Sequence, residues 1–133
     1  MKKIFVNGSF DLLHPGHICL LNTAKSLGDY LLVAIDSDRR ISEKKGFDRP
    51  INNSFVRTNL ISNLKAVNEV KLFDSDEELR NIIKTYQPDI MMIGSDWKNK
   101  PVIGSEFAKE LKFFDRYGDY STTNTIENYL NRR

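Results

Sequence analysis

Two histidines stand close together near the start of the chain, in the segment GSFDLLHPGH. His14 and His17 flank Pro15 and Gly16, between an apolar stretch that favours a strand and one that favours a helix. Imidazole N–H groups fixed at this junction donate hydrogen bonds to oxygens that gain charge during phosphoryl transfer. From the residues alone, a helix cap or a core histidine are alternatives. A zinc pair is disfavoured because no third histidine completes such a site.

Other polar residues gather at comparable places along the chain, each just after an apolar run. Lysine, arginine, serine and threonine side chains and helix N-termini together suit a polyphosphate. Glycines at such places let phosphates approach the backbone closely. Each of these residues alone is also typical of a solvated loop, a helix cap or core packing. The prediction of a phosphate-binding site therefore rests on their combination. The candidates are Gly8, Asp11, Gly16, Lys44, Lys45, Trp97, Arg116, Ser121 and Thr122.

Strands and helices alternate along the sequence and must position these residues. Apolar runs and alternation predict strands over residues 2–8, 30–35, 69–73, 89–94 and 112–114. Spacings of three and four predict helices over 16–27, at Val56, Leu60 and Leu64, from Ser75 to before Pro88, over 105–111 and over 121–130. The charged, aperiodic segment 36–50 predicts a loop.

This alternation predicts a single Rossmann-like α/β domain over residues 1–133. The sheet should have five parallel strands with helices on both faces. In such sheets ligands bind beyond the carboxyl ends of the strands, where the candidate residues stand. No glycine pattern of a dinucleotide site or P-loop follows the first strand, which argues against both classes.

Composition restricts the remaining possibilities. The net charge of +2 gives little support to nucleic acid as the main partner. The single cysteine allows no internal disulfide. No apolar run approaches the roughly 20 residues of a membrane span, and residues 1–6 do not form a signal peptide. A cytoplasmic protein without a membrane partner is expected.

Two segments identify a resemblance over nearly the whole chain. His14-Pro15-Gly16-His17 is similar to the H-x-G-H signature of the cytidylyltransferase-like nucleotidyltransferases, and Ser121-Thr122-Thr123 to their S-T-T signature. GSDWKNK and Arg116 resemble glycerol-3-phosphate cytidylyltransferases. KKGFDRPIN, VIGSE and STTNTI resemble the adenylyltransferase that makes ADP-heptose, usually the second half of a bifunctional kinase, and we favour this subfamily.

The resemblance implies direct in-line transfer of a nucleotidyl group from a nucleoside triphosphate to a sugar or polyol phosphate, with pyrophosphate leaving. Mg²⁺ would bridge phosphate oxygens with few protein ligands, and a homodimer is expected. His14, His17 and Lys45 would stabilise the reacting phosphates, and Arg57 and Lys44 would bind the substrate. The nucleotide would contact Gly8, Phe10, Asp11, Gly16, Gly94, Asp96, Trp97, Arg116, Ser121 and Thr122.

Two other classes of function stay open beside this one. The first is a nucleotide-binding regulator that has lost turnover, against which the intact H-x-G-H and S-T-T segments weigh. The second is a nucleic-acid-binding protein, against which the small net charge weighs. The residues alone do not distinguish adenine from cytosine as the base.

Overall fold

The computed structural model describes residues 1–115, 126 and 130. Parallel strands form one sheet in the order β3-β2-β1-β4-β5, which confirms the predicted fold class. The strands are β1 (Lys3–Gly8), β2 (Tyr30–Asp36), β3 (Glu69–Phe73), β4 (Ile90–Gly94) and β5 (Glu110–Phe114). The central strand β1 lies between β2 and β4, where the strand order reverses and ligand crevices form in such sheets.

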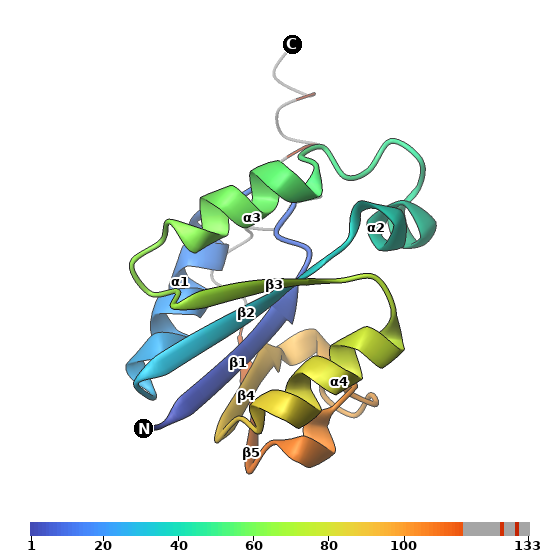
Figure 1. Cartoon of the computed structure of the whole chain (residues 1–133). Coiled ribbons are helices and arrows are strands. Elements are labelled where there is room, and N and C mark those ends of the chain that lie inside the picture. The colour runs from blue at the N-terminus through green and yellow to red at the C-terminus, as the bar shows by residue number, and fades with distance from the viewer. Residues whose placement is uncertain (116–125, 127–129, 131–133) are drawn as a thin grey trace.

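Helices cover both faces of the sheet (Figure 1). α1 (Pro15–Ser26) and α3 (Ser54–Ser62) pack on the face that includes Ile4 and Val6 of β1. α4 (Asp76–Tyr86) packs on the opposite face, against Phe5. Because successive strand residues face opposite sides, each buried strand contributes to both cores, as its continuous apolar run predicted.

The prediction of a loop over residues 36–50 is wrong, because α2 (Asp38–Lys45) occupies its first half. This helix has one buried apolar side chain, Ile41, and therefore no apolar periodicity. It is stabilised at its ends instead. The Ser37 side chain accepts a hydrogen bond from the backbone N–H of Arg40, Asp38 lies in the first turn and lysines lie in the last.

The buried face of α3 also differs from the prediction. Val56 and Leu60 are exposed at 37% and 44%, and Leu64 lies beyond the end of the helix. The buried residues of α3 are Arg57 and Ile61. A helix that buries an arginine presents a different face from the one its apolar residues indicate.

The segment after β4 is more irregular than expected. A short 3₁₀ helix, η1 (Ser95–Trp97), directly follows β4. A second one, η2 (Ser105–Phe107), stands where a helix was predicted over 105–111, and β5 already begins at Glu110. The helix predicted over 121–130 lies outside the described residues apart from 126 and 130. Within the described part of the chain, every helix is too short or too polar to cross a bilayer.

Candidate active site

The two histidines form the N-terminal cap of α1. Nδ1 of His14 accepts a hydrogen bond from the Gly16 N–H at 3.0 Å, and Nδ1 of His17 accepts one from the His14 N–H at 3.3 Å. The rings stack with their centroids 3.7 Å apart. Since Nδ1 is an acceptor in both rings, the neutral form of each carries its hydrogen on Nε2. The capping interpretation is thus confirmed, and the cap itself fixes both rings as Nε2–H donors.

His17 is held in its neutral form. Burial, the neighbouring His14 and the positive charge of Lys45 lower the pKa of His17 from 6.5 to about 4. The Phe10 ring contacts His17 edge-on, with centroids 5.1 Å apart. At neutral pH, His17 therefore acts as a fixed hydrogen-bond donor. It has no proton to give as an imidazolium acid.

A cavity of about 380 Å³ opens at the carboxyl ends of β1, β2 and β4. This volume lies within the usual range for small-molecule sites. Six predicted residues line it, namely Gly8, Lys44, Lys45, Gly94, Asp96 and Trp97. The sequence analysis did not select the other residues of its wall, which are Asn7, Ser9, Asp36, Arg40, Ile41, Leu79, Ile93, Val102 and Ile103.

Lys45 connects the cavity to the histidines. Its charge lowers the pKa of His17, and its side chain lines the cavity. The pKa of Lys45 is itself lowered, first by burial and then by the charge of Arg49. Lys45 therefore places a cation near the capped histidines, an arrangement suited to an anion.

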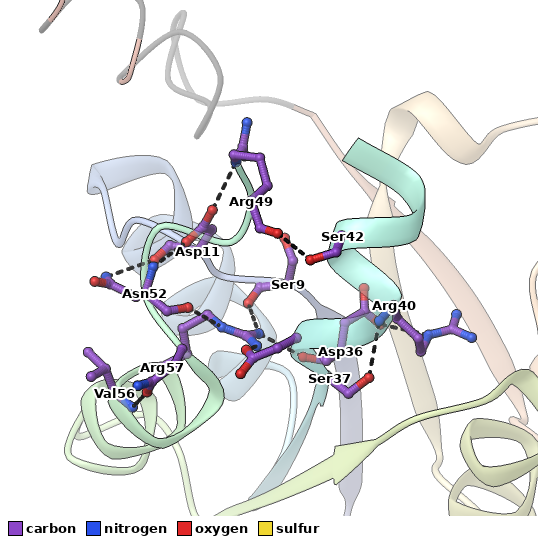
Figure 2. Close-up of polar contacts among 12 residues, drawn as sticks. Ser9, Asp11, Asp36, Ser37, Arg40, Ser42, Arg49, Asn52, Val56 and Arg57 are labelled. Carbon is purple, nitrogen blue, oxygen red and sulfur yellow. Dashed lines mark hydrogen bonds and ion pairs between the residues drawn. The ribbon is translucent and has the colours of Figure 1, made fainter. Parts of the chain in front are cut away.

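Asp11 is buried and has a structural role in the described chain, while its predicted nucleotide contact stays a prediction. Its carboxylate is fully buried and accepts hydrogen bonds from Arg49 Nε and from the N–H groups of Ile51 and Asn52 at 2.9–3.0 Å. The Asn52 side chain donates to the Asp11 carbonyl at 2.9 Å. Asp11 thus fixes the segment after α2 onto the turn that leads into α1 (Figure 2).

Arg57 is also fully buried, below the site instead of at its surface. Its guanidinium donates to the carbonyls of Asn52, Ser9 and Asp36 at 2.7–2.9 Å and to the Asp38 carboxylate at 2.6 Å (Figure 2). A direct contact with substrate would require this cluster to open. The predicted substrate contact of Arg57 stays a prediction, and the geometry assigns it the role of joining three loops.

The remaining predicted residues have simple positions. Gly16 lies in the first turn of α1, and Phe10 has a positive φ of 49°. Arg116, Ser121 and Thr122 lie outside the described residues, so their contacts stay predictions. Among residues 1–115, 126 and 130, no group of three His, Cys, Asp or Glu side chains is placed to hold a metal ion.

Comparison with known proteins gives a consistent result. The family described as cytidylyltransferase-like matches residues 5–128. "Bifunctional protein HldE" of Campylobacter fetus is 46% identical over 123 residues, which cover 92% of this chain and 27% of the relative. The protein of the same name from Nitratiruptor is 44% identical over 126 residues, 95% of this chain and 27% of the relative. The chain thus spans about a quarter of the length of these relatives.

Two solved structures share the fold. A lipopolysaccharide core biosynthesis protein from Thermoplasma volcanium is 27% identical with a TM-score of 0.71, and the match covers 88% of this chain and 98% of that protein. Thermotoga maritima TmcAL, bound with alpha-thio ATP, has a TM-score of 0.69, and the match covers 99% of this chain and 51% of TmcAL. The latter is 13% identical and supports the fold alone.

Acid should destabilise the protein through His17. Between the unfolded pKa of 6.5 and the folded pKa of about 4, the unfolded chain binds more protons, so stability falls as pH falls. Urea unfolding across this interval should show a loss of about 3 kcal/mol from this residue. A His17→Gln variant should show a flatter profile. Equal losses in both proteins would contradict the assignment.

Removing the buried guanidinium should destabilise the protein strongly. We expect Arg57→Met to lower the free energy of unfolding by about 3–5 kcal/mol, because three carbonyls and Asp38 lose their donor. The control is Arg80→Met, since Arg80 is half exposed and paired with Glu106, and it should cost about 0–1 kcal/mol. Urea unfolding at pH 7 measures both, and similar losses would contradict the role of Arg57.

Proposed function

The chain belongs to the cytidylyltransferase-like family, and we propose that it transfers a nucleoside monophosphate from a nucleoside triphosphate to a sugar phosphate. The observation that carries this proposal is the pair of Nε2–H donors at the start of α1, beside Lys45 and the cavity. The identity to the HldE proteins and the KKGFDRPIN segment favour ATP and D-glycero-β-D-manno-heptose 1-phosphate. The likeness to a lipopolysaccharide core biosynthesis protein of Thermoplasma agrees with a saccharide product.

The proposed reaction is one displacement at phosphorus. An ionised oxygen of the acceptor phosphate forms a bond to the α-phosphorus, and the bond to the bridging oxygen breaks. Pyrophosphate leaves with that electron pair. Because the attacking oxygen is already ionised at neutral pH, the protein supplies position and charge stabilisation. This requirement matches a neutral His17 that donates a hydrogen bond.

Each residue then has a proposed role. His14 and His17 donate to the α-phosphate oxygens, and Lys45 and Lys44 approach the phosphates from α2. Arg116, Ser121 and Thr122 would hold the β- and γ-phosphates, as the resemblance implies. Mg²⁺, held by the triphosphate oxygens, would supply charge neutralisation.

A second candidate is transfer from CTP to glycerol 3-phosphate. The observation that favours it is Trp97, which follows Gly94 and Asp96 in the segment GSDW and lines the cavity with them. Both candidates use the same phosphate machinery, so base and acceptor must separate them. The test therefore covers both variables at once.

Pyrophosphate release should be measured for ATP, CTP, GTP and UTP, each with heptose 1-phosphate, hexose 1-phosphates and glycerol 3-phosphate. We expect ATP with heptose 1-phosphate to be the best pair. CTP with glycerol 3-phosphate as the best pair would establish the second candidate. A folded protein that releases no pyrophosphate with any pair and Mg²⁺ would contradict both.

The same assay separates the chemistry of His14 from its capping role. His14→Asn retains an N-cap side chain but has no Nε2–H group. We expect kcat to fall by roughly 10²–10³-fold, as for the loss of one transition-state donor, while thermal stability stays near that of the original protein. Turnover close to that of the original protein would assign His14 to capping alone.

Assembly and location are also proposals. We propose a homodimer in the cytoplasm, the compartment that supplies nucleoside triphosphates. Exposed apolar side chains on neighbouring elements support the dimer, since Phe55 of α3 and Leu72 of β3 are 76% and 48% exposed and line one hollow. Light scattering should give twice the 15.4 kDa chain mass, and Phe55→Asp should lower it. A mass of one chain at micromolar concentration would contradict this.

A further inference from the structure

The cavity wall carries polar groups for which the proposed phosphate contacts give no use. Asn7 lies at the end of β1, Asp36 ends β2, and Arg40 lies in the first turns of α2. Arg40 and Lys44 are four residues apart and therefore share one face of this helix. The wall thus combines the lysines Lys44 and Lys45 with neighbouring groups of mixed polarity.

Asn7 supplies a hydrogen-bond acceptor to the cavity wall. Residues of β1 alternate between the two sheet faces, and Asn7 shares the α4 face with Phe5. Its Oδ1 atom is buried and has no hydrogen-bond partner among the described residues. Buried polar atoms are nearly always paired in folded proteins, so an unpaired one at a cavity wall indicates a ligand. The soft terminal torsion of Asn7 allows the oxygen to turn toward the cavity.

Arg40 and Asp36 supply a donor and an acceptor side by side. Arg40 Nε lies 3.6 Å from Asp36 Oδ1, too far for a hydrogen bond, and it is buried without a partner in the described region. The guanidinium is held by Asp76 at 3.0 Å and stacks over Phe73. Figure 2 shows that the Arg40 side chain points away from the Arg57 cluster. Its orientation is therefore fixed independently of the loops that Arg57 joins.

The charge balance around Arg40 favours a neutral ligand. Arg40 forms ion pairs with Asp36 and Asp76, whereas Lys44 and Lys45 form none within the described part of the chain, so Arg40 attracts a further anion weakly. A hydroxyl group both donates and accepts, and thus matches an adjacent Arg40 Nε and Asp36 oxygen. A second hydroxyl can donate to Asn7 Oδ1. Trp97 and aliphatic side chains complete the wall, as sugar rings with apolar C–H faces require.

We propose that Asn7, Asp36 and Arg40 bind hydroxyl groups of a sugar ring whose phosphate lies against Lys44 and Lys45. This inference rests on the proposed function and names the groups that select the sugar. The ring belongs either to the acceptor sugar phosphate or to the ribose of the nucleotide, since both present the same hydroxyl chemistry. Binding of the two reactants to variants of these residues distinguishes the two sources.

The test compares Asn7→Leu and Arg40→Lys with the original protein by isothermal titration. Leucine has a shape close to that of asparagine without the amide, and lysine keeps the charge of Arg40 without Nε. The probes are heptose 1-phosphate, ATP, 3′-deoxy-ATP and inorganic phosphate. We expect each variant to bind one sugar-bearing probe about tenfold more weakly, as for one lost hydrogen bond, and to bind inorganic phosphate unchanged.

A control variant separates recognition from a general loss of charge or structure. Arg39→Lys makes the same substitution at the neighbouring exposed arginine, which pairs with Asp74. It should bind all probes as the original protein does. Thermal unfolding of Asn7→Leu and Arg40→Lys shows whether each is folded, and either variant alone is sufficient for the comparison.

The outcomes are distinct. Weaker binding of heptose 1-phosphate assigns the ring to the acceptor, and weaker binding of ATP but not of 3′-deoxy-ATP assigns it to ribose. Unchanged affinity for both reactants in a folded variant overturns the inference. Equal weakening toward inorganic phosphate also overturns it, because the loss would then concern charge. A wrong proposed function would give a different result, because the original protein itself would then release no pyrophosphate. That result is distinguishable from unchanged ligand binding in the variants.

Discussion

The arrangement of the site depends on one buried cation. Arg57 contributes from α3 a guanidinium that is fully removed from solvent. Such a charge is stable in a protein interior only when acceptors surround it, and here Ser9, Asp36, Asn52 and Asp38 provide them. These acceptors belong to the loop after β1, the end of β2, the start of α2 and the segment after α2. A single side chain therefore fixes the spacing between the loop that leads to the histidines and the helix that carries the lysines.

Asp11 completes this arrangement from the other side. Its buried carboxylate is neutralised by Arg49 and accepts hydrogen bonds from the backbone N–H groups of Ile51 and Asn52. The segment after α2 is therefore bound through Asp11 to the loop after β1. The carbonyl of Asn52 accepts from Arg57 while its side chain donates to Asp11, which joins the two clusters. The backbone of the site is thus held in place by two buried, fully hydrogen-bonded charges.

The sequence predicted the sheet well because buried parallel strands are continuous apolar runs, such as Tyr30–Asp36. It also predicted the histidine pair, whose spacing is local. It did not predict α2, which is held by end effects and by Arg40 instead of an apolar stripe. It did not predict the structural role of Asp11 and Arg57, because the partners of these buried charges stand some 20 to 50 positions away in the sequence. Arg40 was not selected for the same reason, since its partner Asp76 is also distant in the sequence.

Gly8, at the end of β1, lies between the histidine pair and the cavity. The capped histidines lie on the α1 side of the sheet, whereas the cavity wall at Asn7, Leu79 and Ile93 lies on the α4 side. β1 is the strand between them, and it ends at Gly8. A Cβ atom there would lie 3.1 Å from the Phe10 ring that contacts His17, and Gly8 also lines the cavity. A side chain at this position would therefore push the Phe10 ring toward His17 and would also narrow the cavity. Glycine at the end of the central strand therefore leaves room for the Phe10–His17 contact on one face and for the cavity on the other.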